Sequence, residues 1–315
     1  MIIEKQEILP GEYQQVSLNV SRLPSGTRIY VECHVFRGVE PGPTVLVMAG
    51  VHGDEINGIE SVRRTLDLGV YNNIEKGNVI VIPLLNVFGF INFSREVPDG
   101  KDVNRSFPGT SAGSLASRVA SVLTKKILPH IDYAIDLHTG GASRYNYPQL
   151  RFNAGDDKAL SLAKVFGAPY LIEKPKITRS FRKVATDLGK VVLVYEAGES
   201  VRLDGFSIEI AVDGIKRVLQ HLGMIEKAPV RRHDMVYFKS TGWVRATEAG
   251  LFTWSKSSGS IIKKGEPIGT IHSPQGDRTK RILGKTNGYI IGHNNASVVH
   301  NGDALYHIGY NGERL

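Results

Sequence analysis

The feature of this sequence that most restricts its fold is the alternation of short apolar runs with amphipathic helical patterns between residues 29 and 222. Apolar runs typical of buried strands cover 29–36, 44–49, 79–82, 133–137, 169–172 and 191–195. Apolar residues recur at helical spacing over 56–66, 115–127, 159–166, 181–188 and 208–222. This alternation predicts an α/β fold, with a doubly wound, mostly parallel sheet covered by helices on both faces.

A second part of the chain begins near residue 229. Short apolar runs separated by glycine turns replace the alternation there, and no further helical pattern follows. The stretches 260–271 and 301–308 resemble each other, because each has a Gly-acid turn that leads into an apolar strand. We therefore expect two domains: an α/β domain over 1–228, which would be the catalytic domain, and a small all-β, barrel-like domain over 229–315. The second domain resembles a biotinyl/lipoyl barrel but lacks the carrier-lysine hairpin.

The turn after the run 44–49 contains His52 and Glu55. It lies between a predicted strand and a predicted helix, at the edge of an α/β sheet where ligands bind. An imidazole and a carboxylate so close together can bind one metal ion, and Gly50 and Gly53 relax the backbone of this turn. The alternative is an ordinary first turn of a helix, in which acidic residues only complement the helix dipole.

Two further predicted strands end in polar residues, His138 and Glu196. Because parallel strands bring their carboxyl ends to one edge, these side chains can converge with His52 and Glu55. Two histidines and a carboxylate are the ligand set of many catalytic zinc sites, and a further acid can serve as general base. Taken singly, His138 could be a hydrogen-bonded histidine and Glu196 could cap a loop.

A long loop is predicted from residue 83 to about residue 113. Loops of this length in compact domains are usually functional or disordered. This one contains Arg95 and then Asn104 and Arg105, within the motif Asp-Val-Asn-Arg-Ser-Phe-Pro-Gly. Arg105 alone could be an ordinary surface cation.

In order along the chain, these motifs resemble the succinylglutamate desuccinylase/aspartoacylase family. The resemblance rests on His52-x-x-Glu55, the motif at 102–109, Asp-Leu-His-Thr at 136–139 and Glu196-x-Gly198. It implies a zinc carboxypeptidase type of fold and one Zn²⁺ per chain, bound by His52, Glu55 and His138. By the same resemblance, Glu196 is the base and then the acid, and Arg95 is a candidate for polarising the scissile carbonyl. Asn104 and Arg105 would bind a substrate carboxylate.

Composition restricts the setting in which the protein acts. Net charge is +8, and residues 227–315 hold 13 Lys and Arg against 6 Asp and Glu. This basic part could steer an anionic substrate, but no nucleic-acid module or long basic run is present. The single cysteine excludes an internal disulfide, and neither a signal-type nor a membrane-spanning apolar segment is evident. We expect a cytoplasmic protein with no membrane or nucleic-acid partner. The sequence is compatible with a homo-oligomer as well as with a monomer.

The sequence thus predicts a zinc-dependent amidohydrolase that cleaves a linear amide in a small N-acylated, carboxylate-bearing compound. Two alternatives remain. One is a zinc carboxypeptidase that acts on peptides, which would need an open groove. The other is a non-catalytic zinc- or metabolite-binding protein, which would have no need for Glu196.

Overall fold

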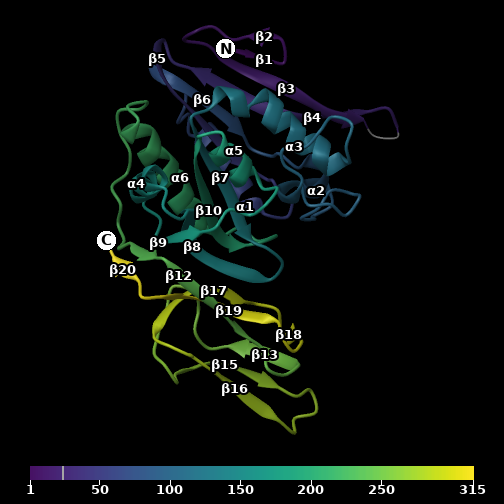
Figure 1. Cartoon of the computed structure of the whole chain (residues 1–315), viewed down its shortest axis with the longest axis vertical. Helices are drawn as coiled ribbons and strands as arrows, with labels where there is room; N and C mark the ends of the chain where they lie inside the picture. Colours follow the sequence, from purple (N-terminus) through teal and green to yellow (C-terminus); the bar gives the residue numbers. More distant parts are fainter. Residues whose placement is uncertain (23–24) are drawn as a thin grey trace.

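The computed structural model describes residues 1–22 and 25–315, and a 14-stranded sheet runs through it (Figure 1). The centre of this sheet consists of four neighbouring parallel strands. In spatial order they are β6 (Lys76–Ile82), β5 (Glu40–Ala49), β7 (Tyr133–Gly140) and β10 (Val191–Glu199). Each lies where an apolar run predicts a buried strand.

Antiparallel strands flank this parallel centre on both sides. On one side lie β4 (Arg28–Arg37) and the long outer strand β3 (Tyr13–Arg22). On the other side β8 (Arg144–Asn153) pairs antiparallel with β10, and β9 (Tyr170–Lys174) pairs parallel with β8. The sheet is therefore mixed, and the prediction of a mostly parallel sheet is correct only for its centre. Only three residues join β7 to β8, too few for a crossover helix, so β8 must run back.

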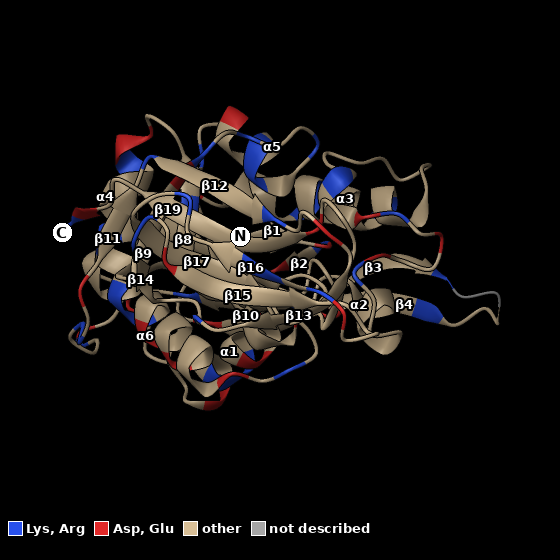
Figure 2. Ribbon diagram, turned by 90° about the horizontal axis from the view of Figure 1, so that it is seen from below, with Lys and Arg blue, Asp and Glu red and all other residues tan. Residues whose placement is uncertain are grey.

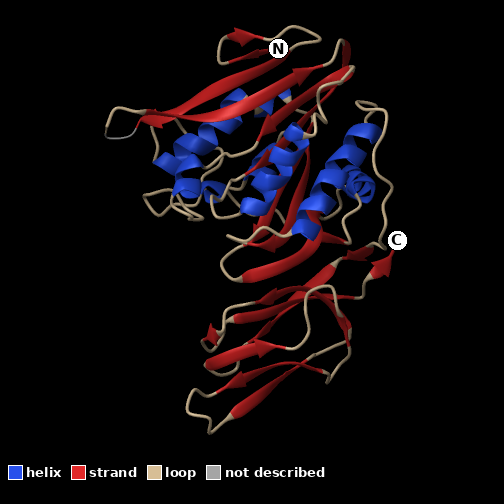
Figure 3. Cartoon of the chain, turned by 180° about the vertical axis from the view of Figure 1, so that it is seen from behind, coloured by secondary structure: helices blue, strands red, loops and turns tan. Residues whose placement is uncertain are grey.

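Helices cover both faces of the sheet, as predicted (Figure 3). On one face lie α1 (Ile56–Asp67), α4 (Asp157–Phe166) and α6 (Gly205–His221). The helices α1 and α4 each pack against α6, and all three cover alternate residues of the central strands. On the other face lie α3 (Leu115–Lys126) and α5 (Phe181–Asp187), which pack against the remaining alternate residues. A short 3-10 turn, η2 (Leu128–His130), follows α3.

Several segments differ from the predicted pattern. β5 begins four residues early, because the segment Pro41-Gly42-Pro43 joins the strand through an irregularity in its pairing with β6. The predicted loop over 83–113 contains the short helix α2 (Val87–Ile91) and the 3-10 turn η1 (Val103–Arg105). A small hairpin, β1 (Ile2–Ile3) and β2 (Gln6–Glu7), begins the chain.

The C-terminal part is built from strands and turns alone among its described residues 229–315, as predicted. Two groups of strands from this part share one apolar core. The first group is β12 (Ser240–Arg245), β14 (Ile261–Ile262), β17 (Gly288–Asn294) and β19 (Ala304–Tyr310). The second is β13 (Gly250–Trp254), β15 (Pro267–His272), β16 (Thr279–Leu283) and β18 (Val298–Val299).

The main sheet continues into this C-terminal part. β17 pairs antiparallel with β8, and β11 (Val236–Phe238) pairs with β9 on one side and with β20 (Glu313–Arg314) on the other. A small aromatic and aliphatic cluster fills the junction, with Phe238 in edge-to-face contact with Tyr170 and Tyr289. The two parts of the chain therefore share both backbone pairing and side-chain packing.

Lys and Arg (blue) and Asp and Glu (red) are spread over helices and loops on both sides of the sheet (Figure 2). One of the two edge strands of the second group, β16, exposes Lys280 and Arg281. Lysines on such an edge discourage pairing with another chain. No helix among residues 1–22 and 25–315 has the length and apolar character needed to span a membrane.

Phe238→Ala tests how strongly the junction is packed. The Phe238 side chain is fully buried, so its removal should lower the free energy of unfolding by about 3–5 kcal/mol, measured by urea denaturation. The control is Phe93→Ala, since Phe93 is 67% exposed and its loss should change stability by less than about 0.5 kcal/mol. Equal effects of the two variants would show that the junction contributes little to stability.

Candidate active site

A cavity of about 700 Å³ opens at the carboxyl ends of the central strands. Its walls come from the β5–α1 turn, the segment between α2 and η1, the strands β7, β8 and β10, the start of α5, and β12 of the C-terminal part. The cavity brings together all seven residues that the sequence singles out: His52, Glu55, Arg95, Asn104, Arg105, His138 and Glu196.

The β5–α1 turn positions His52 and Glu55. Glu55 is the N-cap residue of α1, but its carboxylate makes no capping hydrogen bond. It lies instead 2.8 Å from His52 Nδ1 and accepts a hydrogen bond from the Thr139 amide at 3.0 Å. A side chain at Gly53 would collide with the backbone of Gly89, since its Cβ would lie 1.9 Å from that carbonyl carbon. The Glu55 carboxylate therefore contacts His52 and Thr139 instead of capping its own helix. This argues against the alternative that Glu55 only complements the helix dipole.

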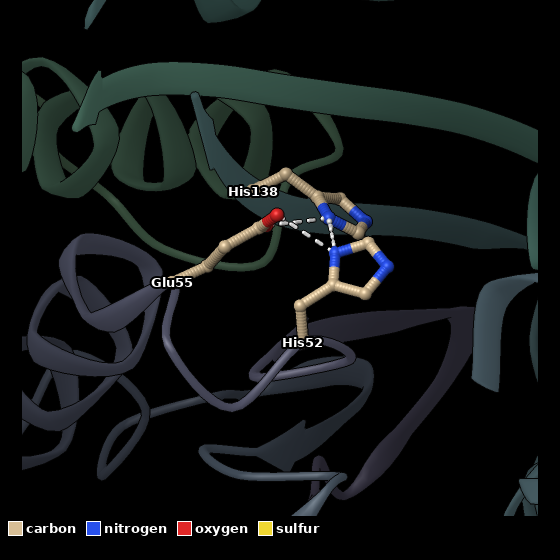
Figure 4. A group of neighbouring side chains, drawn as sticks. All are labelled: His52, Glu55 and His138. Atoms are coloured by element: carbon tan, nitrogen blue, oxygen red, sulfur yellow. Dashed lines mark hydrogen bonds and ion pairs between the residues drawn. The ribbon is translucent and has the colours of Figure 1, made fainter. Parts of the chain in front are cut away.

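His138, from β7, completes a buried cluster with these two residues (Figure 4). Its Nδ1 lies 2.8 Å from the second oxygen of Glu55 and 3.3 Å from Nδ1 of His52. Ligand atoms at about 2.0–2.1 Å from a tetrahedral zinc ion are about 3.3 Å apart, which the separation of the two Nδ1 atoms matches, while both oxygens of Glu55 lie at hydrogen-bond distance from them. The three donor atoms could therefore hold one metal ion.

Acidic side chains face the outer nitrogens of both imidazoles. His52 Nε2 lies 3.2 Å from Asp102 Oδ1. His138 Nε2 lies 3.0 Å from Asp136 Oδ2, without the alignment of a hydrogen bond. Carboxylates in this position favour a proton on the outer nitrogen, which leaves Nδ1 free to bind a metal.

The electrostatics of the cluster favour a cation. Burial alone would lower the pKa of His138, but the carboxylates of Asp136 and Glu55 raise it well above its usual range. For Glu55, burial would raise the pKa, but His52 and His138 hold it well below its usual range. Glu55 is therefore ionised, and a buried carboxylate of this kind requires a positive partner.

Arg95 lies directly beside the cluster. Its Nη1 is 3.3 Å from Glu55 Oε1, and its Nε and Nη2 donate to Asp102 Oδ2 at 3.1 and 2.9 Å. Burial would raise the pKa of Asp102, but His52 and Arg95 hold it well below its usual range. Asp102 thus links the imidazole of His52 to the guanidinium of Arg95 and fixes both at the cavity wall.

Asn104 and Arg105 lie in η1, nearer the mouth of the cavity. The Asn104 side-chain oxygen accepts a hydrogen bond from the Phe181 amide at 3.0 Å, which ties η1 to the start of α5. Arg105 is exposed, and its guanidinium donates to the Asn104 carbonyl at 2.7 Å. Asp102 pairs with Arg95 and not with Arg105, so Arg105 does not stabilise the loop through an ion pair with Asp102.

Glu196 is aligned with His138 in the parallel pairing of β10 and β7, so the two side chains lie on the same face. On its other side, strand β8 supplies two hydrogen-bond donors. Arg151 Nη1 lies 2.8 Å from Glu196 Oε1, and the Asn146 amide donates to Oε2 at 3.0 Å. The carboxylate is thus fixed in the cavity wall next to the His52–Glu55–His138 cluster.

Sequence reasoning did not identify several cavity residues. Asn146 and Arg151 lie on β8, which has no apolar run because polar residues occupy much of both faces. Arg182 lies at the start of α5, and Trp243 comes from β12 in the C-terminal part. No local motif marks these residues. The alternation of polar residues over 144–153 is the one signal that could have revealed β8.

Comparison with known proteins places the chain in a family. The model of the succinylglutamate desuccinylase/aspartoacylase catalytic domain matches residues 41–222. An N-alpha-acetyl-L-2,4-diaminobutyric acid deacetylase from Halomonas elongata is 30% identical over 243 residues, which cover 73% of this chain and 71% of that protein.

Solved structures agree over nearly the whole length. A succinylglutamate desuccinylase/aspartoacylase from Rhodobacter sphaeroides superposes with a TM-score of 0.84 at 27% identity, covering 96% of both chains. The product-bound ectoine utilization protein EutE from Ruegeria pomeroyi has the same fold, with a TM-score of 0.84 at 24% identity and 94% coverage of both chains. The chain belongs to the succinylglutamate desuccinylase/aspartoacylase family.

Proposed function

We propose that this protein is a zinc-dependent hydrolase that cleaves the amide bond of a small N-acyl amino acid-like compound. The observation that carries the proposal is the convergence of His52, Glu55 and His138 beside Glu196 in one cavity. Family membership supports the reaction class, because the relatives bear the names of a deacetylase, a desuccinylase and an aspartoacylase.

His52, Glu55 and His138 would hold the zinc ion. The proposal is supported by the spacing of their donor atoms and by the carboxylates behind both imidazoles. A zinc ion bound by three protein ligands supplies Lewis-acid chemistry, which activates water near neutral pH and polarises a carbonyl. We propose a fold of the zinc carboxypeptidase type, because the ligands follow strands of a sheet whose centre is parallel.

The protein's own groups move the proton and stabilise charge. Water adds to the amide carbonyl, and the C–N bond breaks to give a carboxylate and a free amine. Glu196 accepts the proton from the water and transfers it to the departing nitrogen. We propose that the guanidinium of Arg95, which lies beside Glu55, stabilises negative charge on the former carbonyl oxygen.

The cavity is suited to a small substrate. Its volume of about 700 Å³ is typical of small-molecule sites, and Trp243 of the C-terminal part forms one wall. We propose that residues 1–228 form the catalytic domain and that 229–315 form a β domain that narrows the site. Such a wall favours a deacylase over the alternative of a peptide-cleaving carboxypeptidase.

A hydrolysis screen tests the proposal against both alternatives. Zinc-loaded protein is incubated with N-acetyl and N-succinyl amino acids and with short unmodified peptides, and released amine is quantified. We expect turnover of N-acyl amino acids and little or none of peptides. Preferential cleavage of peptides would establish the carboxypeptidase alternative, and no turnover in any class would favour a binding protein.

Two substitutions separate metal binding from proton transfer. His138→Ala should lose both zinc and activity, because it removes one of three metal ligands. Glu196→Gln keeps the size of the side chain, so it should retain zinc while kcat falls by at least about 100-fold. Zinc content is measured by atomic absorption and kcat by amine release. Full zinc occupancy in the His138 variant or near-normal turnover in the Glu196 variant would contradict these roles.

Arg105 and Asn104 are proposed to bind the substrate carboxylate. A guanidinium matches a carboxylate with two parallel hydrogen bonds, which Lys cannot make. Arg105→Lys should therefore lower kcat/KM by roughly 10- to 100-fold, equivalent to about 1.5–3 kcal/mol for a charged hydrogen bond. Amidating the substrate carboxylate should cost wild-type protein a similar factor and cost the variant little more.

Independent, additive losses from the two changes would instead show that Arg105 does not contact the carboxylate. The matched control is Arg63→Lys. Arg63 pairs with Glu60 on the exposed surface of α1, and its replacement should leave kcat/KM unchanged for both forms of the substrate.

A further inference from the structure

A row of charged side chains crosses three strands on the cavity side of the sheet. In the pairing of β10 with β8, Val194 is opposite Arg151 and Glu196 is opposite Gln149. Arg151 is therefore the diagonal neighbour of Glu196 on the same face. In the pairing of β8 with β9, Arg151 is aligned with Ile172 and Asn153 with Lys174. Lys174 is therefore the diagonal neighbour of Arg151 on the side opposite Glu196.

Within this row, Arg151 has one acidic partner among the described residues. Its Nη1 lies 2.8 Å from Glu196 Oε1, and its Nε donates to the side-chain oxygen of Gln149 at 3.3 Å. Gln149 is fully buried, so its contact restricts where the guanidinium can lie. Asn146, from the same strand, holds the other oxygen of Glu196.

Two further cations lie near Arg151: Lys174, diagonal to it on β9, and Arg182, which also interacts with the charge of Glu196. Arg182 is buried and donates to the carbonyl groups of Lys174 and Pro175. Lys174 donates to Thr241 of the C-terminal part, and His307 Nε2 lies 3.5 Å from its ammonium. Burial and the charges of Arg151 and Arg182 lower the pKa of Lys174 to about 8.

On the β9 side of Arg151, Lys174 is cationic and His307 is neutral. Burial and the nearby charges of Arg151 and Lys174 lower the pKa of His307 well below its usual range, so His307 adds no charge near neutral pH. Repulsion from Lys174 therefore favours an Arg151 guanidinium that points toward Glu196, its carboxylate partner.

We propose that Arg151 is a positioning residue that holds the Glu196 carboxylate in the orientation required for proton transfer. This inference rests on the proposed role of Glu196 as general base. Both groups that hold Glu196 come from β8, the antiparallel neighbour of β10. β8 would therefore support proton transfer by positioning Glu196, although the general base itself lies on β10. A displaced base loses rate steeply, since misplacements of about 1 Å can cost a factor of 100.

The competing interpretation is that Arg151 binds an anionic group of the substrate, because it also lines the cavity. The two roles affect kinetics differently. Loss of a positioning residue lowers kcat and leaves KM nearly unchanged, whereas loss of a substrate contact made equally in the ground and transition states raises KM. A positioning role also depends on Glu196, whereas a substrate contact does not.

The experiment is a double-mutant cycle on the zinc-loaded, full-length protein. Arg151→Met and Arg151→Lys are made in the wild-type and Glu196→Gln backgrounds, and kcat, KM and zinc content are measured with an N-acetyl amino acid. Arg144→Met provides the matched control. Arg144 also lines the cavity but donates to the Gly141 carbonyl, so it tests the loss of a cavity charge that does not contact Glu196.

We expect Arg151→Met to lower kcat by roughly 10- to 100-fold with KM and zinc content nearly unchanged. Arg151→Lys should recover part of the rate, because it keeps a donor and a charge. In the Glu196→Gln background, Arg151→Met should change kcat by less than about 2-fold, whereas Arg144→Met should have the same effect in both backgrounds.

Equal losses from Arg151→Met in both backgrounds, or an effect confined to KM, would overturn the inference. If Arg151→Met fails to fold, as judged by thermal unfolding, the same cycle with Arg151→Lys decides the question, because only a positioning role predicts a kcat loss that disappears with Glu196→Gln. The proposed function fails separately: an active Glu196→Gln variant would remove the base assignment, whatever Arg151 does.

Discussion

The site depends on one buried carboxylate, that of Glu55, which lies between the imidazoles of His52 and His138. A charge so deeply buried is costly unless positive partners and hydrogen bonds surround it. Gly53, in the turn that carries Glu55, packs against the backbone of Gly89, and the Thr139 amide donates to Oε2 of Glu55. Asp102 and Asp136 then face the outer nitrogens of the two imidazoles. The cavity wall is thus a set of alternating charges around a position suited to a cation.

The parallel centre of the sheet and its helices could be predicted from sequence, because buried strands and amphipathic helices leave strong periodic signals. The same logic brought His52, His138 and Glu196 together, since the strands end at one edge. It did not reveal β8, which has no apolar run and shows only an alternation of polar residues over 144–153. Asn146 and Arg151 were missed for that reason, although they hold Glu196. Nor could it show that Arg95, not Arg105, pairs with Asp102, which is a matter of side-chain packing.

The C-terminal strands are more than an appendage. They extend the main sheet through the pairing of β17 with β8, the strand that also carries Asn146 and Arg151. Trp243 reaches the cavity and stacks on His307, which in turn faces Lys174. The composition of this part showed a basic charge balance, but only the fold shows that its residues reach the cavity. The C-terminal part thus pairs with the strand that holds Glu196 and supplies a residue of the cavity wall.

Titration of metal-stripped protein with Zn²⁺ tests the central claim most directly, with amine release from an N-acetyl amino acid as the readout. If His52, Glu55 and His138 form the catalytic metal site, the stripped protein is inactive, and activity rises linearly to one equivalent of zinc per chain and then levels off. Undiminished activity in the stripped protein, or a rise that continues to two equivalents, would contradict this account.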